Sequence, residues 1–185
     1  MKYTMNIAGV DCDLPLCPLN DELYIGAFVI IGKVELTCAC AKALLEKMPA
    51  EYDYMIAPEA KAIPLIHEMA RQSGRNEYLL ARKAKKLYMR DAFEVSVRSI
   101  TTDMDQKLFM DREDAEKMNG KRIVIIDDVI STGESLHTVE ELVKMAGGII
   151  VGRMAVLAEG EAQKRGDITY LAPLPLFDKN GNPIA

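Results

Sequence analysis

The chain has 185 residues and a formal net charge of −5 at pH 7, and 49% of its residues are hydrophobic. This length and apolar content are typical of one domain with a sizeable core. The negative charge argues against nucleic acid as the main partner, and no apolar run in the sequence is long enough to predict a membrane span. The first residues lack the pattern of a secretory signal, so we expect a cytoplasmic protein.

The first 33 residues are rich in turn-forming residues, including Gly9, Pro15 and Pro18, and they end in a predicted strand from Tyr24 to Ile31. All four cysteines of the chain lie within the first 40 residues. Their spacing fits no familiar zinc motif, so we expect reduced thiols, some of them packed as small apolar side chains.

After this part the sequence predicts alternating helices and strands. The predicted helices are Val34 to Met48, Pro64 to Ser73 and a helix that carries Leu136, Val139, Leu142, Val143 and Ala146; the predicted strands are Asp53 to Ala57, Tyr78 to Arg82, Arg122 to Ile126 and Ile149 to Leu157. Such alternation predicts an α/β fold, with a mainly parallel twisted sheet that is flanked by helices on both faces.

The segment from Ala84 to Asp111 departs from this pattern. It is polar, and apolar residues alternate at Phe93, Val95 and Val97. An insertion of this length between sheet strands is usually either disordered or a functional lid.

The most informative segment runs from Arg122 to Ser135. A buried, β-branched strand is predicted to end at an acidic pair, Asp127 and Asp128. A turn follows, and a helix begins directly after it. The turn consists of Ser131, Thr132, Gly133, Glu134 and Ser135. Backbone N–H groups of such a turn and of a helix N-terminus can bind a phosphate, the hydroxyls can add bonds, and the carboxylates can accept from ribose hydroxyls.

This segment resembles the motif of the type I phosphoribosyltransferases that binds phosphoribosyl diphosphate (PRPP). No G-x-x-x-x-G-K-[ST] loop and no G-x-G-x-x-G turn competes with it. The resemblance implies that Asp127 and Asp128 are catalytic and hold the ribose, and that residues 131–135 bind the 5-phosphate. Two further stretches resemble the diphosphate site of the purine branch, and their candidate residues are Glu59, Ala60, Lys61, Arg82, Lys83 and Lys86.

The segment Leu23 to Phe28 resembles the strand that forms part of the base hood in this family, which implicates Ile25, Ala27 and Phe28. Thr102 and Asp103 stand near the place where adenine enzymes usually carry a Glu-Tyr pair. The sequence therefore leaves the identity of the purine base open. Adenine is the first expectation, and xanthine or hypoxanthine/guanine is the alternative. A non-catalytic regulator that binds PRPP is a further alternative.

The resemblance covers nearly the whole chain in matching order. It implies a single domain over residues 1–185, with a small N-terminal hood at about residues 1–33 and a flexible lid hairpin at about residues 84–108. It further implies transfer of the phosphoribosyl group to a purine, a homodimer, and Mg²⁺ bound through PRPP and water without a direct protein ligand. PRPP and a purine base are the expected partners.

Overall fold

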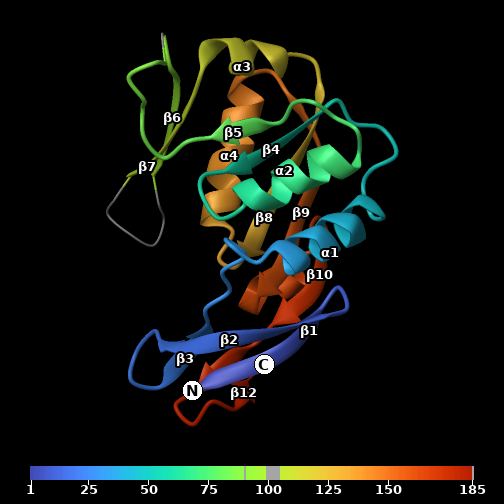
Figure 1. Cartoon of the computed structure of the whole chain (residues 1–185). Helices are drawn as coiled ribbons and strands as arrows, with labels where there is room; N and C mark the ends of the chain where they lie inside the picture. Colours follow the sequence, from blue (N-terminus) through green and yellow to red (C-terminus); the bar gives the residue numbers. More distant parts are fainter. Residues whose placement is uncertain (90, 99–104, 185) are drawn as a thin grey trace.

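The computed structural model describes residues 1–89, 91–98 and 105–184. Its centre is a five-stranded sheet in the order β10-β9-β8-β4-β5, and every neighbouring pair is parallel (Figure 1). The strands are β4 (Tyr54–Pro58), β5 (Leu79–Ala81), β8 (Arg122–Ile130), β9 (Ile149–Glu159) and β10 (Thr169–Leu174). The prediction of a mainly parallel sheet is confirmed.

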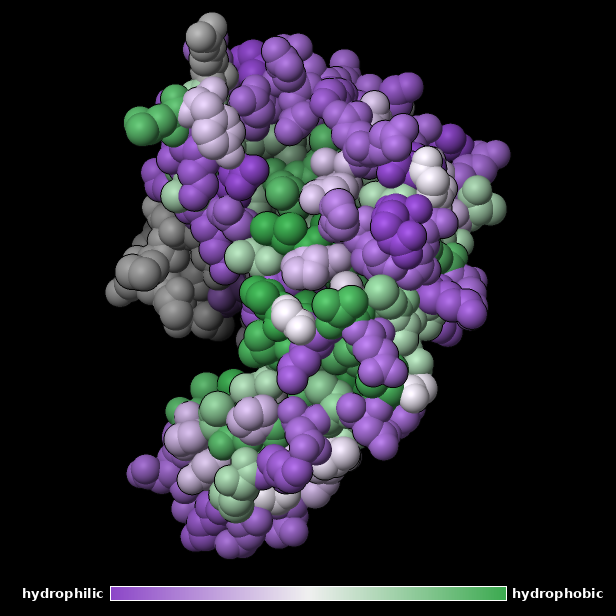
Figure 2. Space-filling model, in the orientation of Figure 1, coloured by the Kyte–Doolittle hydropathy of each residue, from purple (hydrophilic) through white to green (hydrophobic). Residues whose placement is uncertain are grey.

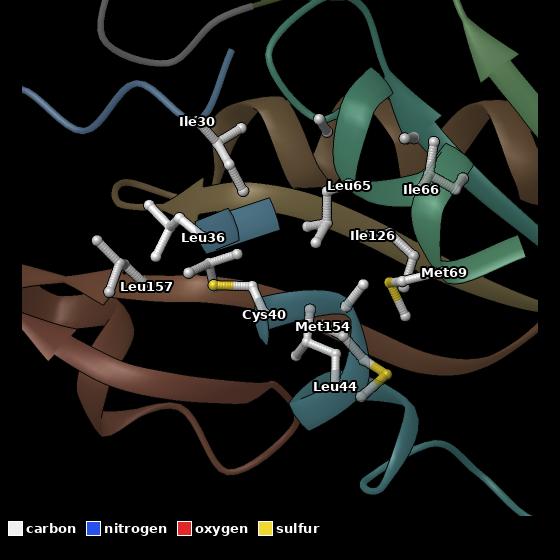
Figure 3. Close-up of a cluster of buried hydrophobic side chains, with 14 of the residues drawn as sticks. Ile30, Leu36, Cys40, Leu44, Leu65, Ile66, Met69, Ile126, Met154 and Leu157 are labelled. Atoms are coloured by element: carbon white, nitrogen blue, oxygen red, sulfur yellow. The ribbon is translucent and has the colours of Figure 1, made fainter. Parts of the chain in front are cut away.

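Helices cover both faces of this sheet, as the alternating pattern predicts. On one face lie α1 (Val34–Leu45) and α2 (Ile63–Gln72), and on the other lie α3 (Arg112–Lys117) and α4 (Glu134–Met145) (Figure 1). Figure 3 shows the first interface, where Leu44 of α1 and Met69 of α2 pack toward Ile126 of β8 and Met154 of β9. Burial of these apolar faces is the main stabilising term of the fold.

A second, antiparallel sheet contains both chain termini (Figure 1). Its strands, in spatial order, are β1 (Lys2–Ile7), β2 (Val10–Pro18), β3 (Leu23–Gly26), β11 (Leu176–Asp178) and β12 (Pro183–Ile184). The turn-rich interpretation of the N-terminus was wrong in this respect, because β1 and β2 form a hairpin. Ala8 and Gly9 both have positive φ, 52° and 87°, which is the geometry of a two-residue hairpin turn that matches strand twist.

Several predicted boundaries differ from the observed ones. The predicted strand from Tyr24 to Ile31 ends at Gly26, and the predicted helix from Val34 to Met48 ends at Leu45. The strand predicted to end at Ile126 continues to Ile130, so the acidic pair lies inside β8 rather than after it. Seven elements have no counterpart in the prediction: β1, β2, α3, the 3-10 helix η1 (Gly160–Lys164), β10, β11 and β12.

The predicted lid segment contains an antiparallel hairpin, β6 (Phe93–Arg98) with β7 (Asp105–Met110). Phe109 and Arg82 exchange backbone hydrogen bonds of 2.8 and 2.7 Å, which joins the hairpin to the end of β5. Val95, Leu108 and Met110 are buried in the same apolar cluster as α4. The pair Thr102 and Asp103 lies outside the described residues.

In the ranges that the structure describes, every helix is too short or too polar to cross a membrane.

Candidate active site

A pocket of about 470 Å³ opens at the carboxyl end of the parallel sheet. Ligands of open α/β sheets bind at this edge, because the loops that leave parallel strands converge there. The pocket is lined by Pro58, Glu59, Ala60, Lys61, Lys83, Asp127, Asp128, Val129 and Ser135. It thus brings together members of three groups that the sequence analysis singled out separately, and it adds Pro58 and Val129, which that analysis did not name.

The acidic pair forms the floor of the pocket. Asp127 is 7% exposed and Asp128 is 4% exposed. The Asp128 N–H donates to Asp127 Oδ1 at 2.8 Å. Burial raises the pKa of Asp127 well above its usual value, and the adjacent charge of Asp128 raises it further. The folded protein therefore disfavours the charged form of Asp127, as is typical of carboxylates at functional sites.

Lys61 reaches the acidic pair from the loop between β4 and α2. Its Nζ lies 2.9 Å from Asp128 Oδ2, and the lysine side chain is half-exposed. This contact is an ion pair and not a hydrogen bond, and within the described part of the chain Oδ2 is a buried oxygen without a hydrogen-bond donor. A buried carboxylate oxygen in this condition is suited to accept from a ligand hydroxyl.

Glu59 fixes the basic stretch that follows β5. A cis peptide bond joins Glu59 to Ala60. Glu59 Oε1 accepts from Arg82 Nη1 at 3.2 Å, and Oε2 accepts from the backbone N–H of Lys83 at 3.2 Å. These contacts hold Lys83 at the pocket. The acidic side chain of Glu59 therefore has a structural role within the predicted diphosphate site.

The other two basic candidates are placed differently. Arg82 lines a neighbouring pocket of about 420 Å³, where its guanidinium lies 5.9 Å from the ring of Tyr88. Lys86 is not among the residues that line the acidic pocket, and its N–H donates to the sulfur of Met89 at 3.5 Å. In this conformation, then, the structure brings Lys61 and Lys83 to the pocket and leaves Lys86 apart from it.

The predicted phosphate loop leads directly into α4. Gly133 precedes the helix with φ +82°, a left-handed conformation that favours glycine. The Glu134 N–H lies 3.4 Å from Thr132 Oγ1, and Ser135, in the first turn, lines the pocket. Ser131 and Thr132 lie in the turn before Gly133 and are not among the residues that line the pocket. The first-turn N–H groups of a helix this long attract anions.

The three predicted hood residues lie in and after β3. Ile25 and Ala27 are half-buried, whereas Phe28 is 3% exposed and packs in the core cluster beside α1. None of the three lines the acidic pocket. Glu159, which was not among the candidate site residues, ends β9 at the same sheet edge; burial raises its pKa, and the charge of Lys61 opposes that rise. Its place at the end of a predicted strand was the available signal.

Comparison with known proteins agrees with this geometry. The sequence profile described as "Phosphoribosyl transferase domain" matches residues 36–172. The adenine phosphoribosyltransferase of Thermotoga petrophila is 31% identical over 123 residues, which is 66% of this chain and 64% of that protein. The orotate phosphoribosyltransferase of Caldanaerobacter subterraneus is 28% identical over 113 residues, which is 60% of this chain and 48% of that protein. The chain therefore spans just under two thirds of the first relative and about half of the second.

Solved structures resemble the fold over more of its length. Adenine phosphoribosyltransferase from Thermoanaerobacter pseudethanolicus superimposes with a TM-score of 0.70 at 19% identity, over 86% of this chain and 95% of that one. The same enzyme from Rhodothermus marinus gives 0.70 at 22% identity, over 87% of this chain and 94% of that one. The profile covers most of the sequence and the fold agrees with it, so the chain belongs to the phosphoribosyltransferase domain family, with the type I fold.

Proposed function

We propose that the protein transfers the 5-phosphoribosyl group of PRPP to a purine base, adenine, and releases diphosphate. The observation that carries this proposal is the composition of one pocket. It combines the buried acidic pair, the two lysines Lys61 and Lys83, and the N-terminus of α4. These three features suit the ribose hydroxyls, the diphosphate and the 5-phosphate of PRPP, respectively. The choice of adenine is supported by the names of similar proteins.

The acidic pair is proposed to bind the ribose and to receive a proton. Asp128 Oδ2 is a buried acceptor suited to a ribose hydroxyl. Asp127 is assigned the role of proton acceptor, because burial and the neighbouring charge raise its pKa above the usual carboxyl value and so make its carboxylate more basic. The proton would come from the ring nitrogen of the purine as that nitrogen bonds to the anomeric carbon.

The lysines are proposed to stabilise the leaving diphosphate. Displacement at the anomeric carbon needs little covalent chemistry from the protein; it needs alignment of the base and stabilisation of the departing charge. Lys61 is half-exposed and can turn from Asp128 toward a phosphate, and Lys83 is positioned by Glu59. Closure of the lid hairpin, residues 84–108, over the bound substrates would exclude water, which otherwise competes with the base.

Magnesium is proposed to bind through PRPP. Among the described residues, no three His, Cys, Asp or Glu side chains are grouped as a metal site. Hard cations prefer phosphate, hydroxyl and water oxygens, and the donor set of Asp127 and Asp128 is compatible with such an ion beside the ribose. When bound, Mg²⁺ would neutralise charge on the diphosphate.

A second copy of the chain is proposed to cover the apolar surface at the start of α1. Val29, Ile31 and Val34 are exposed there, Val34 by 75%, and the adjoining groove is lined by Ile63 and Pro64 of α2. Figure 2 shows hydrophobic residues gathered in a band across the middle of this face. Sedimentation analysis should give a dimer that Val34→Glu converts to a monomer, whereas a monomeric wild type would contradict this part of the proposal.

Calorimetric titration with PRPP tests the site directly. We expect saturable binding of one PRPP per chain, weakened at least about tenfold by Asp128→Asn, because an amide oxygen accepts from a hydroxyl more weakly than a carboxylate. Lys164→Gln serves as a control, because this exposed lysine pairs with Glu161 outside the pocket. Equal affinity of the wild type and Asp128→Asn would contradict the proposed ribose contact.

A further inference from the structure

A guanidinium group lies against the backbone of the predicted phosphate loop. A Cβ atom built on Gly133 would lie 2.9 Å from Nη1 of Arg165, so this nitrogen is in contact distance of the loop. Arg165 follows η1 at the end of β9, whereas Gly133 follows β8. Because β8 and β9 are parallel neighbours, the segments after their carboxyl ends meet at one edge of the sheet.

Asp167 holds this guanidinium in a defined orientation. Arg165 Nε lies 2.9 Å from Asp167 Oδ1, and Nη2 lies 2.7 Å from Oδ2, a bidentate pair that uses one edge of the guanidinium. The remaining nitrogen, Nη1, faces Gly133. Asp167 Oδ2 is also 3.7 Å from Arg153 Nε, and Arg153 pairs with Glu140 of α4. The arginine is thus connected, through two carboxylates and a second arginine, to the helix that the loop begins.

The absence of a side chain at Gly133 leaves room for the guanidinium of Arg165. Any Cβ at this position would push the guanidinium away, and φ +82° already favours glycine. Apart from the Glu134 carboxylate, the loop offers neutral N–H and hydroxyl groups, while Asp127 and Asp128 contribute negative charge to the pocket. A phosphate bound there needs a cation to offset that charge, and the two pocket lysines come from the opposite side, at the ends of β4 and β5.

We propose that Arg165 binds the 5-phosphate of the substrate through Nη1, and that Asp167 is the positioning residue that keeps it directed at the loop. This inference rests on the proposed function, since it assigns a further contact to the same ligand. It predicts that Arg165 recognises the phosphate monoester of the sugar rather than the diphosphate or the base. A bound phosphate oxygen would accept from Nη1, while the other two nitrogens stay on Asp167.

The test compares Arg165→Gln with Lys164→Gln, which removes a charge from the neighbouring residue, whose side chain is 75% exposed. Both are titrated with PRPP and with ribose 5-phosphate. We expect Arg165→Gln to weaken both ligands by about tenfold to a hundredfold, the range for loss of a charge-assisted hydrogen bond, and Lys164→Gln to change neither by more than about twofold. Arg165→Lys should restore part of the affinity, because a point charge remains.

Steady-state kinetics distinguish a phosphate contact from a structural role. Loss of a contact that is made equally in the ground state and the transition state raises the KM for PRPP and leaves kcat unchanged. Asp167→Asn should shift the KM in the same direction by a smaller factor. Unchanged affinity for ribose 5-phosphate in Arg165→Gln, with a wild type that binds it, would overturn the inference and leave the proposed function intact. A wild type that binds neither PRPP nor ribose 5-phosphate would instead overturn the proposed function.

Discussion

Replacement of Asp127 by asparagine is expected to stabilise the folded protein at neutral pH while it weakens function. The carboxyl is 7% exposed, and its pKa is raised first by burial and then by the charge of Asp128. Asparagine Oδ1 can still accept from the Asp128 N–H, which lies at 2.8 Å, and its amide can donate toward the Asp128 carboxylate. The substitution therefore removes the charge and keeps the hydrogen bond.

The size of the gain in stability can be taken from other functional sites, where groups needed for activity often destabilise the folded protein. Removal of a strained functional group typically stabilises by about 0.5–2 kcal/mol, which corresponds to a rise in Tm of about 1 to 8 °C for a chain of this size. The gain depends on pH, because the folded pKa of Asp127 lies above the unfolded value of about 3.9. The wild-type carboxyl is favourable below that value and loses its contribution as the pH rises through the folded pKa.

Urea denaturation, followed by circular dichroism between pH 4 and pH 8, measures this effect. The advantage of Asp127→Asn should be near zero at the acid end and greatest at pH 8. Asp53→Asn is the opposite control, because Arg122 lowers the pKa of Asp53 to about 2 and this substitution should destabilise at pH 8. An Asp127→Asn protein that is less stable than the wild type at pH 8, or whose advantage does not vary with pH, would refute the reasoning.

Three further predictions concern the core, an ion pair and the thiols. Leu44→Ala should lower the free energy of unfolding by about 2–5 kcal/mol in urea, because Leu44 is fully buried and a cavity would remain. Arg71 holds the pKa of Glu68 at about 2, so this pair stabilises above pH ~4.3 and its contribution is lost as the pH falls toward 2; Glu68→Gln should flatten the acid limb of a Tm-against-pH curve. Burial raises the pKa of the Cys40 thiol to about 12, so a thiol-specific reagent at pH 8 should label the exposed Cys17 in the native protein and Cys40 only after unfolding.

Local patterns predicted four of the five strands of the parallel sheet, all but β10, and three of its four helices, all but α3. The run from Ile123 to Ile126 is apolar and β-branched because β8 is buried on both faces, and the helical spacing after Gly133 reflects one face of α4 on the core. The acidic pair and the hydroxyl-rich turn stand next to each other in the sequence. The part of the site that they form could therefore be predicted without tertiary information.

The rest depended on contacts between distant residues. Strand β3 pairs with β11, so that Leu176 lies opposite Ile25, and neither short segment has a pattern that indicates its partner. The placement of Lys86 away from the pocket is a property of the chain's path after β5, which charge patterning does not contain. Arg165 stands in an ordinary polar turn, and only the parallel pairing of β8 and β9 brings it to Gly133.

Formation of nucleotide and diphosphate from PRPP and Mg²⁺ tests the central claim most directly. Adenine, xanthine, hypoxanthine, guanine and orotate are supplied separately, with Asp128→Asn as the control. We expect turnover with adenine that is lost or strongly reduced in the control. PRPP binding without turnover of any base would contradict the catalytic function and favour a regulator that only binds PRPP, and turnover of a different base would contradict the choice of adenine.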